Sequence, residues 1–168
     1  QEIGALPLLV ERLVRASALA AADAELDVTN TLQQLTRCIA NLLVHCECRA
    51  QLVACGGIAP LLAMGSSPAN EVRAACARAL ANMSFDPDYS EKIVEAAGLP
   101  VIISMLHEHD APQVQQEAAW AVLNLSVSPA NEPALIASGV LEPIAALLRV
   151  DNIVVQEQAR ARLFAPPP

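Results

Sequence analysis

Apolar residues recur along the chain in two alternating kinds of segment. One kind is an almost continuous apolar run, as in GGIAPLLAM from Gly56 and GVLEPIAALL from Gly139. The other is amphipathic, as in EAAWAVLNLSV, where Glu117, Trp120 and Asn124 fall on one stripe of a helix and the apolar side chains lie away from it. Both patterns predict helices, and the continuous runs predict helices buried between neighbours.

The two kinds of segment repeat with a period of 41 or 42 residues. The amphipathic segments are marked by three asparagines at that spacing, namely Asn41, Asn82 and Asn124. The apolar runs keep the same phase, except that Gly4 and Gly56 are 52 residues apart, which indicates an insertion near positions 17–28. A period of this length, held through two separate elements, predicts a solenoid of stacked helical repeats.

Each unit is predicted to contain three helices. A short segment such as YSEKIVEAA precedes the apolar run, and the glycine at the junction ends it because glycine accepts the left-handed conformation. A proline follows in the first turn of the apolar helix, where its missing N–H is not needed. The predicted units span residues 1–46, 47–88, 89–130 and 131–165 of a single domain, with a proline tail at 166–168.

These motifs resemble the armadillo repeat. The shared features are the G-x-(I/L)-P-x-(L/I)-(V/I) run, the V-x-x-x-A-A-W-A-(L/V)-x-N-L helix and the period, over roughly residues 3–165. The resemblance implies an all-α, right-handed α-solenoid of about four three-helix armadillo repeats, the first being truncated. The third helices are similar to those of importin-α-type and β-catenin-type arrays. HEAT repeats are the structural alternative, although they usually lack the short first helix and its glycine.

The single tryptophan, Trp120, is open to two interpretations. A lone tryptophan is typical of a core, yet the equivalent positions hold Arg37 and Arg78, and arginine is seldom buried without a partner. This favours a surface position. The asparagines also allow two interpretations, a hydrogen bond at a helix end to a neighbouring loop or a place on the exposed stripe, and their recurrence favours the second.

In the armadillo family the third helix lines a concave groove, so the resemblance implies that this stripe binds an extended peptide. An asparagine amide can donate to and accept from the peptide main chain, and a tryptophan ring can form the wall of a side-chain pocket. The predicted groove residues are Arg37, Asn41, Arg78, Asn82, Glu117, Trp120 and Asn124.

The predicted ligand is a peptide of mixed acidic and apolar character. Import receptors of the family repeat a Trp–Asn pair over several units and bind lysine-rich signals, whereas this chain has one such pair, Trp120 with Asn124. The arginines at positions 37 and 78 favour carboxylates or phosphorylated side chains instead. The expected partner is therefore a protein segment closer in character to the ligands of β-catenin-type arrays.

An alternative function is structural. The chain is predicted to begin in a second helix, which leaves an apolar face at the open end of the stack. The residues of this predicted self-association face are Leu6, Leu9, Val10 and Leu13. A homo-oligomer formed through it would make the array a segment of a larger assembly, of a cytoskeletal or axonemal type.

Composition narrows the classes of partner and compartment. The net charge of −8 disfavours nucleic-acid binding, which needs a basic surface. Five cysteines, an odd number, suit a reducing compartment better than a disulfide framework. No run of 18 uninterrupted apolar residues occurs, and the amino terminus lacks the basic leader of a signal peptide. We therefore expect a protein of the cytoplasm or nucleus without direct membrane insertion.

Motifs for catalysis, cofactors and metals are weak. The sequence has no glycine-rich phosphate loop, no G-x-S-x-G motif and no paired carboxylates beside a base, so we expect neither an enzyme nor a cofactor. The HCEC run at residues 45–48 lacks a second cysteine pair at zinc-finger spacing, and we expect a turn there instead of a metal site. The HEH run at 107–109 is expected in a solvated turn. Cys38 and Cys76 are expected to be small core residues.

Overall fold

The structure is a computed structural model that describes residues 4–22, 27–107 and 111–149, and within these ranges all regular structure is helical. The α-helices are α1 (Ala5–Ala22), α2 (Thr29–Leu42), α3 (Cys46–Ala54), α4 (Ile58–Ala63), α5 (Asn70–Met83), α6 (Pro87–Glu95), α7 (Gly98–Leu106), α8 (Pro112–Leu125), α9 (Glu132–Ala137) and α10 (Leu141–Arg149). Two short 3₁₀ helices are η1 (Met64–Ser66), after α4, and η2 (Pro129–Asn131), before α9.

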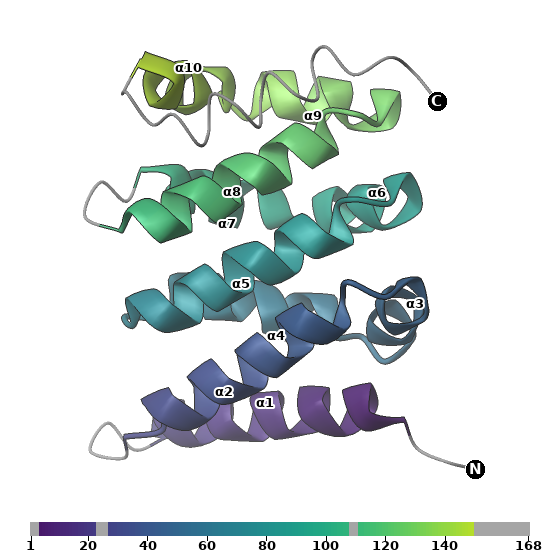
Figure 1. Cartoon of the computed structure of the whole chain (residues 1–168), viewed down its shortest axis with the longest axis vertical. Coiled ribbons are helices and arrows are strands. Elements are labelled where there is room, and N and C mark those ends of the chain that lie inside the picture. The colour runs from purple at the N-terminus through teal and green to yellow at the C-terminus, as the bar shows by residue number, and fades with distance from the viewer. Residues whose placement is uncertain (1–3, 23–26, 108–110, 150–168) are drawn as a thin grey trace.

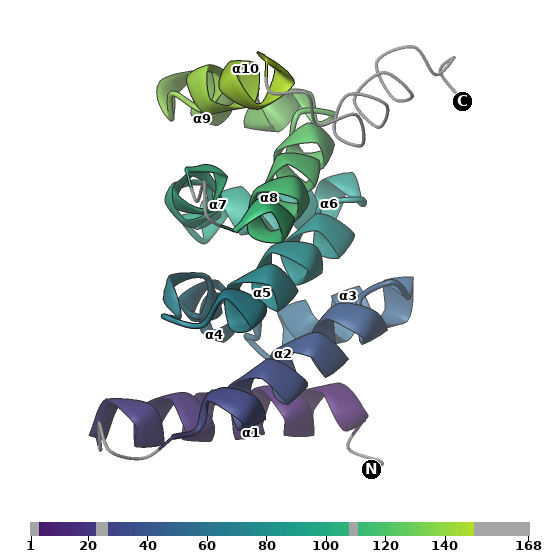
Figure 2. The same ribbon diagram turned by 60° about the vertical axis from the view of Figure 1, so that its left-hand side comes forward.

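The helices stack in repeating three-helix units (Figure 1). In each complete unit a short first helix leads into a second helix and then a long third one, as in α3–α4–α5 and α6–α7–α8. The third helices α2, α5 and α8 pack side by side, α2 on α5 and α5 on α8, with α4 and α7 behind them (Figures 1 and 2). The chain is therefore an α-solenoid, which confirms the predicted fold class. The predicted third helix of the fourth unit lies outside the described residues.

Small residues let the third helices approach one another closely. Helix α5 lies between α2 and α8 and is an alanine-rich helix. Its fully or almost fully buried alanines are Ala74, Ala75, Ala77, Ala79 and Ala81.

Among the described helices none is by itself long and apolar enough to cross a membrane. The pair Cys46–Ala54 and Ile58–Ser66 reaches that length and apolar character only when its two members are taken together, and they are bent by 96°.

The predicted insertion lengthens the second helix of the first unit. Helix α1 has 18 residues, whereas its equivalent α7 has 9. The predicted self-association face on α1 is wrong, because Leu6, Val10 and Leu13 are buried and Leu9 is half-buried. These side chains are covered because α1 packs against α2, α3 and α4. The exposed large apolar residues of α1 are Leu8, Val14 and Leu19.

The junction between the first and second helices uses the left-handed backbone conformation, as the glycine pattern predicts. Gly56 and Gly139 have φ angles of 70° and 73°. In the unit between them the same position is Ala97, with a φ of 59°. Glycine adopts this conformation readily, whereas the Cβ of other residues meets the backbone there. The second complete unit therefore holds a strained residue at its junction.

Replacing Ala97 with glycine is expected to stabilise the fold by about 1 kcal/mol, because glycine removes the steric cost of the left-handed conformation. The free energy of unfolding in urea, followed by circular dichroism, measures the change. Gly56→Ala, which creates the same strain in the neighbouring unit, should lower stability by a similar amount. A destabilising Ala97→Gly substitution would contradict the assignment of strain.

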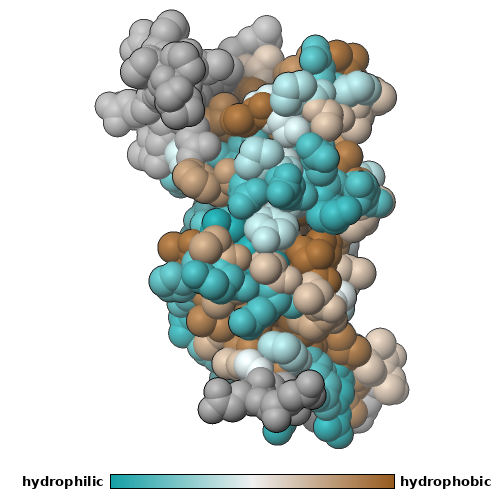
Figure 3. Space-filling model, turned by 90° about the vertical axis from the view of Figure 1, so that its right-hand side faces the viewer, coloured by the Kyte–Doolittle hydropathy of each residue, from teal (hydrophilic) through white to brown (hydrophobic). Residues whose placement is uncertain are grey.

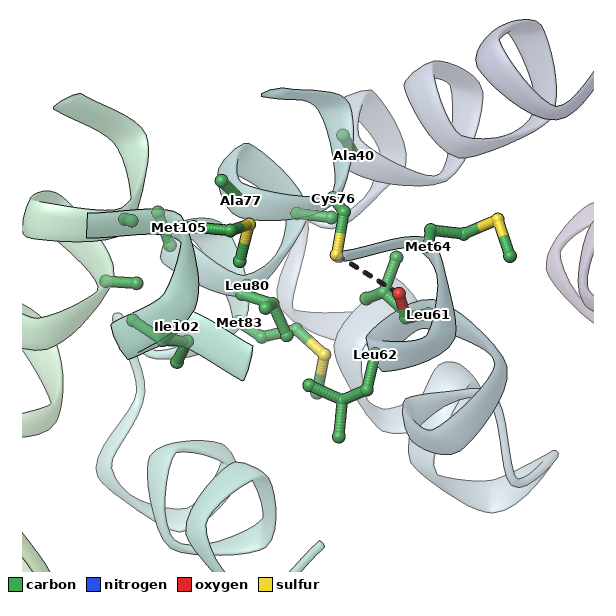
Figure 4. Close-up of a cluster of buried hydrophobic side chains, with 14 of the residues drawn as sticks. Ala40, Leu61, Leu62, Met64, Cys76, Ala77, Leu80, Met83, Ile102 and Met105 are labelled. Atoms are coloured by element: carbon green, nitrogen blue, oxygen red, sulfur yellow. Dashed lines mark hydrogen bonds between the residues drawn. The ribbon is translucent and has the colours of Figure 1, made fainter. Parts of the chain in front are cut away.

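The core runs the length of the stack and is rich in sulfur between the two complete units (Figure 4). Met64, Met83 and Met105 are buried there with Cys76, whose Sγ donates a hydrogen bond of 3.1 Å to the main-chain oxygen of Leu61. Burial raises the pKa of the Cys76 thiol to about 12, so the side chain stays neutral. Cys76 is thus the small core residue that was predicted.

The prediction that Cys38 lies in the core is wrong, since its side chain is exposed. The equivalent residues of α5 and α8, Ala79 and Ala121, are fully buried. Each of those helices packs on a preceding third helix, whereas α2 is the first third helix of the described stack. The same repeat position is therefore core in two units and surface in the first.

Candidate peptide-binding face

The predicted groove residues lie on the three third helices, α2, α5 and α8, and we call this set the third-helix face. It comprises Arg37, Asn41, Arg78, Asn82, Glu117 and Trp120, together with Asn124 at its end. Arg37 and Asn41, on α2, are exposed. The residues on α5 and α8 are half-buried, apart from Asn124, whose side chain is 2% exposed. Accessibility along the face thus falls from the first unit to the third.

The structure brings Arg78 and Glu117 together across the contact between α5 and α8. Burial raises the pKa of Glu117 above its usual value, and the neighbouring Arg78 charge opposes part of that increase. The Nε of Arg78 is buried and finds no hydrogen-bond acceptor among the described residues. Arg37 is more open, and its Nη2 donates to Gln34 Oε1 at 2.6 Å. The face therefore presents two guanidinium groups in different degrees of burial.

Trp120 combines the two interpretations that the sequence left open. The Trp120 side chain is half-buried: one part packs against the hydrophobic core, and the other part of the same side chain is accessible to solvent. A partly covered ring is held in place by the core and still offers apolar surface to a ligand. It can therefore serve as the wall of a side-chain site.

The asparagines on α5 and α8 join successive third helices. Asn82 Nδ2 donates to the main-chain oxygen of Ala40, and Asn124 Nδ2 donates to that of Ala81, both at 2.9 Å. Each acceptor is the residue before the asparagine of the preceding unit. The last carbonyl groups of an α-helix have no partner within the helix. Each asparagine therefore caps the end of the helix before it.

This contact corrects the prediction for Asn124. Because the side chain is buried and bound to α5, its amide does not face an approaching peptide. The alternative interpretation, a hydrogen bond at a helix end, describes it better, although the partner is a helix and not a loop. Asn82 makes the same bond but stays half-buried, and Asn41 is exposed.

A second column of buried polar residues could have been found from the sequence and was missed. It consists of Arg49, Ser90 and Asn131, which are 41 residues apart and at most 8% exposed. Arg49 Nη1 donates to the main-chain oxygen of Leu43 at 3.0 Å, and Asn131 Nδ2 donates to that of Leu125 at the same distance. Both bonds satisfy carbonyls at the end of a third helix. The spacing of 41 residues could have revealed this column, but the three positions hold different residue types, so the sequence pattern does not mark them as equivalent.

The candidate metal positions do not come together. The HCEC run forms the start of α3, with His45 at the cap position and Cys46 exposed. Over the described part of the chain, no group of three histidine, cysteine, aspartate or glutamate residues could hold a metal ion. Of the HEH run, His107 ends α7 and is exposed, and the other two residues lie outside the described residues.

Two stretches of the chain, residues 45–85 and 86–127, match the Armadillo/beta-catenin-like repeat. These stretches coincide closely with the two complete three-helix units of the stack. The chain belongs to the armadillo-repeat family.

Curated relatives share part of this stack. Vacuolar protein 8 of Candida albicans is 33% identical over 91 residues, which make up 54% of this chain and 15% of that protein. Vacuolar protein 8 of Schizosaccharomyces pombe is 34% identical over 83 residues, or 49% of this chain and 14% of that protein. The chain thus spans only about a seventh of the length of these relatives.

Among solved structures, a designed armadillo repeat protein in complex with the peptide (KR)4 has a TM-score of 0.79 and 26% sequence identity. The similarity covers 93% of this chain and 62% of that chain. The armadillo arrangement therefore extends beyond the two matched stretches to nearly the whole stack.

Proposed function

We propose that the chain is a non-enzymatic scaffold that binds an extended peptide segment of a partner protein along its third-helix face. Armadillo repeats commonly serve as protein-binding scaffolds, and a designed relative was solved with a bound peptide. The observation that supports this function best is the pair of arginines, Arg37 and Arg78, at one repeat position of the packed helices α2 and α5, with Trp120 at the same position of α8.

We propose a ligand of mixed acidic and apolar character. Arg78 offers a partly buried guanidinium with an unsatisfied Nε, and an ion pair is stronger where water is partly excluded. Arg37 offers a second, open guanidinium one unit away. Trp120 offers apolar surface beside them. Guanidinium groups bind carboxylates in a bidentate geometry, so this face favours an acidic peptide over a basic one such as (KR)4.

The peptide main chain has two candidate amide partners on this face. Asn41 is exposed, and its amide can donate to and accept from an extended chain. Asn82 is half-buried and already donates to Ala40, which leaves its oxygen as the group for a peptide N–H. We assign no peptide contact to Asn124, because it is buried.

Reversing the charge of both arginines, as Arg37→Glu with Arg78→Glu, is expected to lower the affinity for a fluorescein-labelled (Asp-Leu)6 peptide at least about tenfold, a change of about 1.4 kcal/mol. Attraction between guanidinium and carboxylate becomes repulsion between carboxylates. Fluorescence anisotropy measures the affinity. Glu117→Gln should change it in the opposite direction, because it removes a negative charge beside Arg78.

The matched control is the double reversal Arg12→Glu with Arg15→Glu on the exposed side of α1. It changes the net charge by the same amount but lies on α1 and not on a third helix, so affinity should change by less than about twofold, the size of an electrostatic effect screened by salt. Equal losses in the two double variants would show that net charge, and not the third-helix face, governs binding.

An assembly function remains the second candidate, favoured by the exposed Leu8, Val14 and Leu19 on α1. Under that function the arginine reversals leave peptide affinity unchanged, and the chain sediments as an oligomer.

We propose a cytoplasmic or nuclear location for either function, because all five cysteines are free thiols.

A further inference from the structure

An exposed apolar residue recurs at the turn after every described third helix. These residues are Val44, Phe85 and Val127, which we call the turn ladder, and they are 62%, 62% and 63% exposed. Each follows the asparagine of its unit by three positions. Single exposed apolar side chains are ordinary, but the same position with the same exposure in three units indicates a surface with a use.

The turn ladder lies at the end of the third-helix face. Positions 37, 41 and 44 follow the spacing i, i+4, i+7, which places residues on one side of a helix. The intervening cap residue, Leu43, keeps a right-handed helical conformation, as Ser84 does before Phe85. Figure 3 faces the side on which the third helices end in Figure 1, and hydrophobic surface is interspersed there with hydrophilic surface.

Acidic residues follow each position of the turn ladder in the sequence, at the start of the next helix. Glu47, Asp88 and Glu132 lie in the first turns of α3, α6 and α9, and all three are exposed. A carboxylate of a bound peptide is therefore repelled at the ladder and attracted at the arginines. The two edges of the third-helix face select opposite kinds of side chain.

An extended peptide matches two such edges, because its successive side chains point to opposite sides. Side chains on one side of a strand repeat every ~6.7 Å, whereas packed helices lie about 8–10 Å apart, at the low end when small residues separate them. The alanine contacts of α5 favour the low end. At the low end the two spacings differ by about 1.3 Å per repeat, or about 2.6 Å over the two intervals between three units, which flexible side chains can span. On this basis we assign one dipeptide to each repeat.

We propose that the turn ladder recognises every second side chain of the peptide, so that the ligand is an extended segment in which acidic and apolar residues alternate. The acidic side chains point toward Arg37 and Arg78, and the apolar ones pack on Val44, Phe85 and Val127. This inference rests on the proposed function, and it adds the residues that choose the apolar side chains and the order in which the two kinds occur.

The experiment compares three labelled peptides by fluorescence anisotropy: (Asp-Leu)6, (Asp-Ser)6 and (Asp-Asp-Leu-Leu)3. The last has the composition of the first without its alternation. The test variant carries Val44→Ser, Phe85→Ser and Val127→Ser. The matched control carries Leu8→Ser, Ile136→Ser and Leu141→Ser, at exposed apolar residues outside the ladder. Thermal unfolding by circular dichroism verifies that both variants fold.

The wild-type chain should bind (Asp-Leu)6 at least about tenfold more tightly than either other peptide. The ladder variant should lose this preference while keeping its affinity for (Asp-Ser)6, and the control variant should behave as wild type. Equal binding of (Asp-Leu)6 and (Asp-Asp-Leu-Leu)3 overturns the alternation, and an unchanged ladder variant overturns the role of the ladder. If the arginine reversals leave the affinity for (Asp-Leu)6 unchanged, the proposed function itself fails, whatever the ladder variant does.

Discussion

Replacing Asn124 with alanine is expected to destabilise the stack by about 2 kcal/mol, because a buried hydrogen bond between α5 and α8 is lost and a small cavity forms. The side chain is 2% exposed and donates to Ala81 across the contact between α5 and α8. The main-chain oxygen of Ala81 keeps its second hydrogen bond, from Ser84 Oγ of its own helix end. In a repeat protein the loss falls on one interface between neighbours. The free energy of unfolding and its dependence on urea concentration measure the change, and a lower slope would indicate that the two units have begun to unfold separately.

The other two asparagines are matched controls for this effect. Asn41→Ala removes the same side chain from an exposed position and should change stability by less than about 0.5 kcal/mol. Asn82→Ala should fall between them, since its amide makes the same bond from a half-buried position. If all three substitutions cost the same, the asparagines do not stabilise the stack through these hydrogen bonds.

Replacing Gly98 with alanine is expected to destabilise the fold by about 2–3 kcal/mol, the cost of overpacking a tight contact. A Cβ there would lie 2.6 Å from Cγ2 of Ile93 and 2.7 Å from the main-chain oxygen of the same residue. The oxygen belongs to α6, so relief requires the backbone of that helix to move away from α7. The midpoint and slope of urea unfolding measure the loss.

Gly56→Ala separates this steric effect from conformational strain. Gly56 has a left-handed backbone, yet an added Cβ would meet no atom within 4 Å. Its substitution should therefore lower the free energy of unfolding by only about 1 kcal/mol, because alanine is strained in the left-handed conformation but meets no neighbouring atom. A larger loss at Gly56 than at Gly98 would show that close contact between α6 and α7 is not the reason for glycine at position 98.

The helix pattern, the period and the junctions could be predicted because each follows from local chemistry. Apolar spacing identifies helices, and the glycine positions 56 and 139 do adopt the left-handed conformation. The prediction failed where a neighbouring helix decides exposure. The apolar side of α1 seemed to lie at an open end, but Leu6, Val10 and Leu13 pack inward against α2, α3 and α4.

The candidate site shows the same division. Sequence spacing placed the arginines, the tryptophan and the asparagines on one stripe, and in the structure these residues range from exposed on α2 to buried at Asn124 on α8. Spacing along one helix does not reveal what the next helix covers. Asn41 and Asn124 hold the same repeat position, yet one is exposed and the other caps the preceding helix.

By itself the sequence determined the repeat, its three helices and the side chains that each third helix presents, because these depend on periodicity and backbone preference within a unit. Only the tertiary structure decided which of the equivalent side chains remain accessible. A position that faces the preceding unit is buried where that unit has a third helix, as at Ala79, and open where the described stack begins, as at Cys38. Burial is a property of the contact between units, which no single unit of the sequence contains.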